Sequence, residues 1–408
     1  MSNKTILATC YAVNPFKGSE DGMGWNFVYQ IARFNKVIAI TRENNRDAIE
    51  KFMAQNPDPI YQNITYMYFD LPYWMRFWKK GGRGAMLYYT MWQRGIVSFI
   101  KKQNLKFDIA HNVNFHNDWT PSYLWKLNKP MVWGPIGHHP IIPAQYLKPY
   151  AASYLIKDRA TWFVKKAFWN TSFSLKTTVK KANHIFCMNT GVEKMLNLKN
   201  KSFSIQPSVA TEDFYQHDIP KKENFHLISV GRFVPLKGFD LTLFSFIQFL
   251  KELSPEEKKE CKLTLVGTGP EKAFYQKIIA EHQVEQYVEI IEWIDRKDLM
   301  KLYEKASVFL FPSHEGAGMV VAEALSFGLP VVCLNNEGPG EFINTNCGIA
   351  VDQLDYEATI KGLSQALVKL QADKDLRYKM SLDARKHFEN NFTWNSRGEH
   401  LNAVYNKL

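Results

Sequence analysis

Two glutamates between Phe311 and Leu334 are the residues of this sequence best suited to chemistry. Glu315 stands in a turn of small residues, and Glu323 is the only charge in an otherwise apolar pattern. An ionised carboxylate in apolar surroundings costs several kcal/mol unless it accepts hydrogen bonds. Hydroxyls of a ligand could donate them to Glu323, and so could buried backbone amides or an arginine of the protein itself.

The stretch around the two glutamates predicts a strand, a glycine-rich turn, a helix and a second strand. The apolar runs Ser307–Phe311 and Pro330–Leu334 are typical of buried strands. Between them, Met319–Phe327 has a helical pattern that ends at a glycine and a proline, in the order expected of a helix C-terminus. The free backbone N–H groups at the start of this helix are suited to an anion. They belong to Gly316, Ala317, Gly318 and Met319.

Two cations are expected at another turn of the same kind. The apolar run Phe225–Val230 predicts a strand that leads into a loop with Arg232 and Lys237, and an apolar helix follows at Phe239–Leu250. Arginine can hold a diphosphate through its fork of donors, and lysine can hold it as a point charge. The alternative is a pair of solvated loop residues.

Histidines follow two predicted strands of the first half. His111 comes after Phe107–Ala110, and His138 and His139 come after Lys129–Trp133. Because the carboxyl ends of parallel strands meet at one edge of a sheet, these imidazoles would lie beside a crevice. A structural or solvated role is the alternative for each histidine.

The N-terminal segment predicts a further ligand-facing loop. A strand at Thr5–Ala12, a loop at Asn14–Gly24 and a helix at Trp25–Phe34 follow one another. In such a loop Gly22 would allow the backbone to approach a ligand closely. The alternative is a long surface turn.

Together these motifs resemble those of retaining glycosyltransferases of family GT4. The pattern Glu-Gly-x-Gly followed by Glu-Ala-x-x-x-Gly-x-Pro-Val, at 315–331, is similar to the family's donor-site signature, and Gly-Arg-x-x-x-x-Lys-Gly at 231–238 is similar to its pyrophosphate motif. Gly-Ser-Glu-x-Gly-x-Gly-Trp at 18–25 resembles the first loop of a bacterial, polysaccharide-type subgroup. The sequence departs from the family at Ala317, where Phe is usual, and at His138 and His139, which replace glycines.

The resemblance implies an α/β fold of the GT-B type, in which two Rossmann-like domains with parallel sheets face each other across a cleft. Residues 1–206, completed by a C-terminal helix at 391–408, would form the acceptor-binding domain, and residues 221–388 the donor-binding domain. The implied reaction moves a hexose from a UDP- or GDP-sugar to a hydroxyl of a glycan or lipid-linked acceptor, with retention, in cell-surface polysaccharide or glycolipid assembly.

The resemblance also implies a role for each candidate residue. Arg232 and Lys237 would hold the pyrophosphate, Glu315 would orient the sugar, Glu323 would hold the ribose hydroxyls, and the backbone at Ile294 would contact the base. The amides of 316–319 would stabilise the departing phosphate. That phosphate would take the acceptor proton itself, and His111 or His138 would be a functional histidine. The donor-site motifs at 231–238 and 315–331 contain no Asp-x-Asp, so neither a metal nor a cofactor is expected, the nucleotide sugar being a substrate.

Charge is unevenly distributed along the chain, whose net charge is +11. The first 210 residues contain 28 Lys and Arg against 11 Asp and Glu, whereas the remainder has a net charge of −6. This asymmetry indicates that the first half meets an anionic membrane face or a phosphate-bearing acceptor. Nucleic-acid binding is not expected, because no motif of that class is present. Segments 71–100 and 150–182 interleave aromatic and basic residues, as an interfacial membrane helix does, although aromatics packed under a lid would look the same.

Other features of the sequence indicate a cytoplasmic protein, either free or peripheral on the inner face of the membrane. No apolar run approaches the roughly 20 residues of a spanning helix, and the first residues predict a strand better than a signal peptide. Five scattered cysteines predict neither disulfides nor a zinc site. Three alternatives to a transferase remain: a nucleotide-sugar 2-epimerase on the same fold, an inactive sugar-nucleotide-binding partner in an assembly complex and, as a distant third, a nucleic-acid-binding protein.

Overall fold

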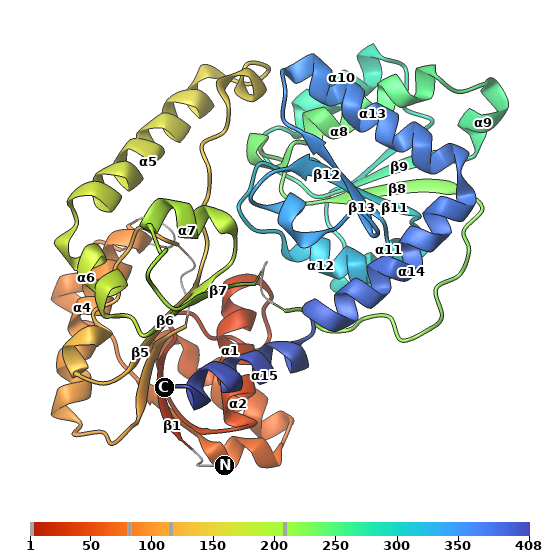
Figure 1. Cartoon of the computed structure of the whole chain (residues 1–408). Coiled ribbons are helices and arrows are strands. Elements are labelled where there is room, and N and C mark those ends of the chain that lie inside the picture. Colours follow the sequence, from red (N-terminus) through yellow and green to blue (C-terminus); the bar gives the residue numbers. More distant parts are fainter. Residues whose placement is uncertain (1–3, 80, 82–83, 114–116, 207–209) are drawn as a thin grey trace. The chain divides into compact units, whose positions relative to one another are not determined.

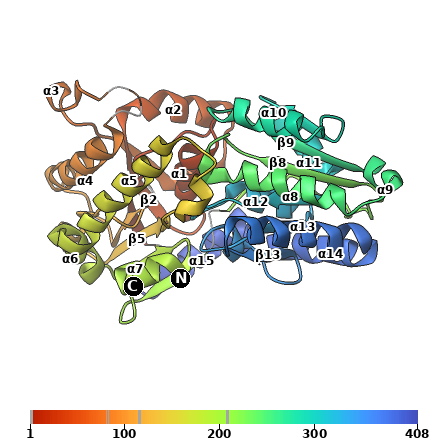
Figure 2. The same ribbon diagram turned by 90° about the horizontal axis from the view of Figure 1, so that it is seen from above.

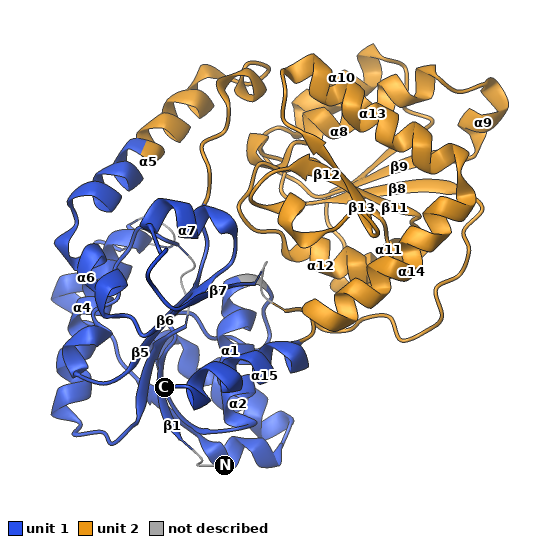
Figure 3. Cartoon of the chain, viewed as in Figure 1, with its two compact units in different colours: residues 1–138, 163–209, 394–408 blue, residues 139–162, 210–393 orange. Residues whose placement is uncertain are grey.

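The computed structural model describes the chain except residues 1–3, 80, 82–83, 114–116 and 207–209 (Figure 1). It contains two compact units (Figure 3). Unit 1 comprises residues 1–138, 163–209 and 394–408, and unit 2 comprises residues 139–162 and 210–393. Each unit is built on one sheet of parallel strands, which confirms the predicted α/β class.

Unit 1 contains a seven-stranded sheet in the order β3-β2-β1-β4-β5-β6-β7. Its strands are β1 (Thr5–Thr9), β2 (Lys36–Thr41), β3 (Ile64–Tyr68), β4 (Ile109–Asn112), β5 (Met131–Ile136), β6 (His184–Cys187) and β7 (Phe203–Ile205). Its helices are α1 (Ser19–Ala32), α2 (Arg46–Gln55), α3 (Tyr73–Arg76), α4 (Ala85–Lys102), part of α5 (Ala152–Thr171), α6 (Phe173–Lys181), α7 (Thr190–Leu196) and α15 (Trp394–Asn406).

The structure corrects one prediction for unit 1 and adds a strand. Helix α1 begins at Ser19 rather than Trp25, so the predicted loop ends early and Gly22 lies in the first helical turn. Two acidic residues in that turn, Glu20 and Asp21, favour a helix start there because they complement the helix dipole. The sheet also continues into β7, which pairs with β6 close to the end of the predicted 1–206 domain and has no counterpart among the predicted strands. Three residues are too few to show a strand pattern.

Unit 2 contains a six-stranded sheet in the order β10-β9-β8-β11-β12-β13. Its strands are β8 (Phe225–Val230), β9 (Cys261–Val266), β10 (Val288–Ile291), β11 (Val308–Phe311), β12 (Val331–Asn335) and β13 (Gly348–Asp352). Its helices are α8 (Phe239–Lys251), α9 (Pro255–Lys259), α10 (Lys272–Glu281), α11 (Arg296–Lys305), α12 (Met319–Ser326), α13 (Tyr356–Ala372) and α14 (Lys374–Asn391).

Helices cover both faces of this second sheet. Residues of α8, α10 and α13 form the core on one face, and residues of α12 and α14 form the core on the other, as Figure 1 shows. Strand β11 contributes to both, because Val308 and Leu310 point to the first core and Phe309 and Phe311 to the second. Burial on both faces explains why the strands of this unit read as continuous apolar runs.

Residues 139–162 pack with unit 2 although they lie in the first half of the sequence. Tyr146 and Tyr150 are buried in the core formed by α8, α10 and α13. Their hydroxyls hydrogen-bond Thr359 Oγ1 at 2.8 Å and Tyr275 Oη at 3.2 Å. Helix α5 therefore contributes residues to both units (Figure 3), which the sequence pattern did not indicate.

The five cysteines are free and buried. Among the described helices, none combines the length and the apolar character that are needed to span a bilayer.

Candidate functional site

Three loops of unit 2 meet where strands β8, β11 and β12 end, and these strands are neighbours in the sheet. The His314 N–H donates to the Leu236 carbonyl at 2.9 Å, which joins the loops after β11 and β8. The Asn336 side chain donates to the Ser313 carbonyl at 2.8 Å, which joins the loops after β12 and β11. Open α/β sheets bind their ligands at this edge.

Two glycines allow the three loops to touch through their backbones. Gly238 has a φ of +67°, and a Cβ there would lie 2.0 Å from the Pro312 oxygen. A Cβ on Gly338 would lie 1.6 Å from the Glu315 oxygen. Neither position can hold a larger residue unless the backbone moves, so these glycines fix the shape of the edge.

Lys237 and Glu315 form an ion pair at this edge. Lys237 Nζ donates to Glu315 Oε2 at 2.6 Å, and the side chains are 18% and 13% exposed. Burial raises the pKa of Glu315 above its usual value, and the charges of Lys237 and Arg232 oppose this shift. The structure thus brings together the three charged residues that the sequence predicted for the pyrophosphate and the sugar.

Arg232 differs from Lys237 because its side chain is exposed. Its guanidinium makes no hydrogen bond or ion pair with any residue that the structure describes, although its carbonyl accepts from the Val234 N–H at 2.8 Å. The next residue, Phe233, donates its N–H to the Thr268 carbonyl at 2.9 Å, so the loop is held against the end of β9. A guanidinium on an anchored loop can meet an anion without first leaving a partner.

Backbone N–H groups at the start of α12 lie next to these cations. The Gly316 N–H donates to His139 Nδ1 at 3.2 Å. Within the described part of the chain, the N–H groups of Ala317, Gly318 and Met319 have no hydrogen-bond partner, as is normal at a helix start. Together with Arg232 and Lys237 they form an edge that favours negative charge.

Glu323 lies on α12, with only 8% of its side chain exposed. Its Oε1 accepts a hydrogen bond from Arg296 Nη2 at 2.9 Å. Arg296, the first residue of α11, is 48% exposed, and its guanidinium lies 4.8 Å from the centre of the Phe214 ring. Burial raises the pKa of Glu323, and Arg296 lowers it. The arginine that the sequence left as an alternative partner is therefore present, on the surface rather than in the core.

Two further residues that were predicted to contact a ligand pack against the protein itself. Ile294 is half-buried beyond the end of β10 and packs against the core around α12. Gly22 is buried in α1, where a Cβ would lie 2.3 Å from the Lys17 oxygen. The glycine is thus needed for local packing, and a contact between Gly22 and a ligand stays a prediction.

His111 is fully buried at the end of β4 in unit 1. Its Nδ1 lies 2.6 Å from the Tyr405 hydroxyl, and its Nε2 lies 2.7 Å from the Gly134 carbonyl. The carbonyl can only accept, so Nε2 carries the proton and the Tyr405 hydroxyl donates to Nδ1. Burial lowers the pKa of His111 to about 3. Both nitrogens are engaged, which favours a structural role that joins β4 to α15.

His138 is arranged differently. Its Nδ1 lies 2.8 Å from Asp118 Oδ2, both side chains are buried, and the Trp169 ring lies 5.3 Å away. Asn189 holds the backbone of His138 on both sides, accepting from its N–H at 3.2 Å and donating to its carbonyl at 2.8 Å. A carboxylate on Nδ1 orients the ring and leaves Nε2 as the nitrogen that can act. Of the two predicted histidines, His138 has the geometry of a functional one.

Three residues of these arrangements were not predicted as site residues: Arg296, His139 and Asp118. The burial of Glu323 signalled that a partner was needed, but nothing marked Arg296 among the 51 Lys and Arg. His139 was noted as an unusual residue, without its contact to Gly316.

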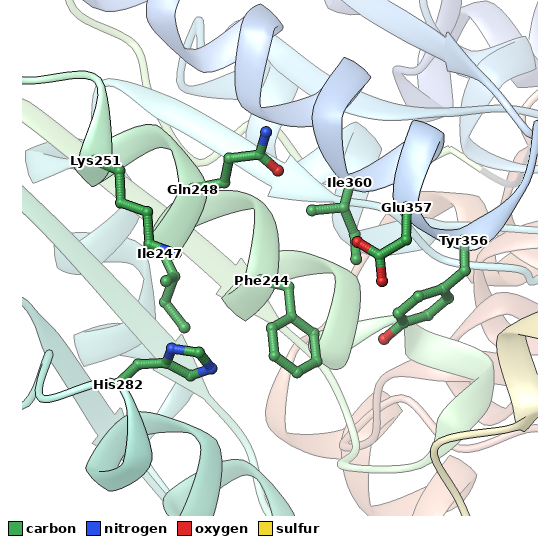
Figure 4. A pocket seen from close by; sticks show the side chains of 8 residues that line it. All are labelled: Phe244, Ile247, Gln248, Lys251, His282, Tyr356, Glu357 and Ile360. Carbon is green, nitrogen blue, oxygen red and sulfur yellow. The ribbon is translucent and has the colours of Figure 1, made fainter.

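Figure 4 shows a cavity of unit 2 between α8 and α13, with His282 at its side. None of the predicted site residues lines it. The candidate site is therefore the loop edge rather than this cavity.

The part of the chain that contains this edge is similar to known proteins. Residues 209–387 match the family model of glycosyl transferases group 1. They include every predicted donor-site residue of unit 2, and the 231–238 and 315–331 motifs lie within the match.

Two curated relatives are similar over less than half of the chain. The uncharacterized glycosyltransferase YqgM of Bacillus subtilis is 28% identical over 163 residues, 39% of this chain and 44% of that protein. A GDP-mannose-dependent monoacylated alpha-(1-6)-phosphatidylinositol monomannoside mannosyltransferase of Corynebacterium glutamicum is 25% identical over 182 residues, 43% of this chain and 45% of that protein. The chain thus spans less than half the length of these relatives.

A solved structure is similar over nearly the whole chain. Sucrose-phosphate synthase from Thermosynechococcus elongatus superposes with a TM-score of 0.65, covering 99% of both chains, at 17% sequence identity. A likeness at this identity shows the fold alone. Together with the two parallel sheets, it confirms the predicted α/β fold of the GT-B type.

Proposed function

We propose that this chain is a retaining glycosyltransferase of the GT4 type that moves a hexose from a nucleotide diphosphate sugar to an acceptor hydroxyl. The observation that carries the proposal is the loop edge of unit 2, where Arg232, Lys237, Glu315 and the first amides of α12 converge. The match of residues 209–387 to group 1 glycosyl transferases supports it.

The chemical work of this edge is to stabilise negative charge. When the bond from the sugar to the diphosphate breaks, charge develops on the phosphate oxygens. Arg232, Lys237 and the N–H groups of Ala317 to Met319 are in place beforehand, so little reorganisation is required as the charge appears. In this scheme the leaving phosphate takes the acceptor proton, and no protein nucleophile and no metal are assigned.

The Lys237–Glu315 pair gives the donor two partners at once. In the absence of donor each charge satisfies the other at 2.6 Å. With donor bound, Lys237 turns to the diphosphate and Glu315 accepts from sugar hydroxyls, so the buried carboxylate stays satisfied. Gly316 likewise exchanges His139 for a donor oxygen.

The nucleoside end of the donor is assigned to Glu323 and the backbone at Ile294. The ribose hydroxyls donate to the free edge of the Glu323 carboxylate while Arg296 keeps the other edge. In unit 1, His138 is assigned as the histidine that faces the substrates, because Asp118 orients its ring. Its Nε2 would donate to or accept from a sugar or acceptor hydroxyl.

The acceptor is proposed to be a glycan or a lipid-linked glycan in cell-surface assembly. The similarity to the Corynebacterium relative, a mannosyltransferase named for a phosphatidylinositol monomannoside, supports a lipid-linked acceptor. Exposed aromatic residues among basic ones in unit 1, including Trp74 and Phe163, support a peripheral contact with an anionic membrane.

The test is transfer itself. Purified protein is incubated with UDP- and GDP-hexoses, with and without membrane lipid extract, and nucleotide diphosphate release and the anomeric configuration of the product are measured. Lipid-dependent release with a retained configuration is expected. An epimerised donor without acceptor would show the 2-epimerase instead, and no turnover with any donor would contradict the proposal.

A further inference from the structure

A second cluster of charged residues lies in unit 1, where strands β1, β2 and β3 end. Arg42 directly follows β2, and Asp70 is the second residue after β3. Arg42 Nε lies 3.2 Å from Asp70 Oδ1, and the side chains are mostly buried. The carboxyl edge of a parallel sheet is where open α/β units take their ligands, and the edge of unit 2 already shows this arrangement.

Asp70 holds Arg42 by one edge only. The Tyr88 hydroxyl donates to Asp70 Oδ1 at 2.5 Å, and the Glu43 N–H donates to Asp70 Oδ2 at 3.3 Å. The carboxylate thus accepts three hydrogen bonds, and it contacts the guanidinium only at Nε. The two terminal nitrogens of Arg42, which form the fork that suits phosphate, are not engaged by Asp70.

Two more cations, Lys79 and Arg76, lie near Arg42 and Asp70. The Arg42 guanidinium lies 5.5 Å from the centre of the Tyr88 ring, and Lys79 Nζ lies 5.8 Å from the same centre. Arg76 Nε donates to the Leu71 carbonyl at 2.9 Å, one residue beyond Asp70. The nearby carboxylate of Glu43 is paired with Arg46 instead.

These groups leave an excess of positive charge in a half-buried place. Burial lowers the pKa of Lys79, and the charges of Arg42 and Arg76 lower it further, while Asp70 opposes them. Like charges held together in this way destabilise the free protein, and a bound anion relieves the repulsion.

Apolar rings stand in solvent next to these cations. Tyr73, Trp74 and Phe77 are 74%, 71% and 59% exposed. They lie on or directly after α3, the short helix that also carries Arg76, at the periphery of unit 1 (Figure 2). Cations beside exposed aromatic rings match a ligand with an anionic head and an apolar chain.

We propose that this cluster is an acceptor subsite that binds the phosphate group of a single amphiphilic molecule, with Arg42, Arg76 and Lys79 on the phosphate and Trp74 and Phe77 on the apolar chain. The inference rests on the proposed function, because it names the class of acceptor: a glycosyl acceptor attached to a lipid through a phosphate ester.

The test uses the full chain and three soluble probes: octyl phosphate, inorganic phosphate and the neutral 1,2-octanediol. Binding is measured by isothermal titration for the parent, Lys79→Gln and Trp74→Ala. Lys102→Gln, an exposed lysine at the end of α4, is the matched control. Octyl phosphate should bind more tightly than either other probe. Its affinity should fall about tenfold in each of the two site variants and stay unchanged in the control, and Lys79→Arg should restore most of it.

Several outcomes would overturn the inference. Equal affinity for inorganic phosphate and octyl phosphate would leave a simple anion site without a lipid chain. Binding to vesicles with phosphatidic acid, but no binding of octyl phosphate, would indicate a membrane surface rather than a subsite. An unchanged affinity in Lys79→Gln with an unchanged circular dichroism spectrum would place the probe elsewhere.

Titration of the same preparation with UDP and GDP separates this inference from the proposed function. Nucleotide binding without octyl phosphate binding contradicts the acceptor subsite alone. Octyl phosphate binding without nucleotide binding contradicts the glycosyltransferase and leaves an anionic amphiphile site.

Discussion

Replacing Glu323 by Gln tests whether its carboxylate exists for a ligand or for the fold. The change keeps the shape of the side chain, and the amide oxygen can still accept the hydrogen bond from Arg296 that the carboxylate accepts at 2.9 Å. Arg296 is half exposed, so it returns to solvent at little cost, and ion pairs with exposed partners contribute roughly 0–1 kcal/mol. Removing a buried charge offsets this loss. The free energy of unfolding without ligand should therefore change by about 1 kcal/mol or less.

The effect on ligand binding should be larger. If the carboxylate accepts from ribose hydroxyls, the variant loses the charge that strengthens these hydrogen bonds, which is worth roughly 1.5–3 kcal/mol. The affinity for the nucleotide should then fall by about 10- to 100-fold.

The pH dependence of the free energy of unfolding gives an independent test of Glu323→Gln. Burial raises the pKa of Glu323 in the folded protein, so the folded state binds this proton more tightly than the unfolded state does. The contribution of Glu323 to stability is then fully present below its unfolded pKa and is lost as the pH rises through the folded pKa. The unfolding free energy of the variant relative to the parent should increase over that range.

Chemical denaturation and nucleotide titration of the parent and Glu323→Gln decide whether the carboxylate serves the ligand or the fold. A loss of 3–5 kcal/mol without ligand, together with unchanged nucleotide affinity, is what a buried structural ion pair would give. That result would refute the assignment of Glu323 to the donor.

Three further predictions follow from other residues of the two units. Arg232→Ala should weaken donor binding by roughly tenfold or more at an unchanged melting temperature. Lys237→Ala should weaken donor binding and also lower the melting temperature, because it leaves the buried carboxylate of Glu315 unpaired. Nucleotide titration and thermal melts measure both effects, and an equal loss of stability in the two variants would contradict the prediction. Burial lowers the pKa of His314 to about 4, so the folded protein holds this histidine neutral and loses stability as the pH falls from 6.5 towards 4. His314→Asn should lose about 3 kcal/mol less over this range than the parent does, and an equal dependence of the unfolding free energy on pH in the two proteins would contradict this. His138→Gln should reduce transfer about 100-fold at unchanged donor affinity, and normal turnover would remove this histidine from the mechanism.

The sequence predicted best those features that depend on neighbours along the chain. The strand at Phe225–Val230 and the helix starts at Phe239 and Met319 were correct to the residue, because continuous apolar runs and glycine turns mark them locally. The loop edge of unit 2 was predictable for the same reason, since parallel strands bring their carboxyl ends together.

Features that depend on distant neighbours could not be predicted. Arg296 and Glu323 are 27 positions apart on different helices, and His139 meets Gly316 from 177 positions away. The packing of Tyr146 and Tyr150 into unit 2 is of the same kind. No local pattern records which of many possible partners a side chain finds, so tertiary packing decides it.

Isothermal titration of the parent and of Arg232→Ala with UDP and GDP shows directly whether the loop edge of unit 2 binds a nucleotide diphosphate. We expect one of the two nucleotides to bind the parent with one-to-one stoichiometry, and Arg232→Ala to weaken this binding by roughly tenfold or more without a change in stability. Failure of both nucleotides to bind the parent, or equal affinity in the two proteins, would contradict this expectation.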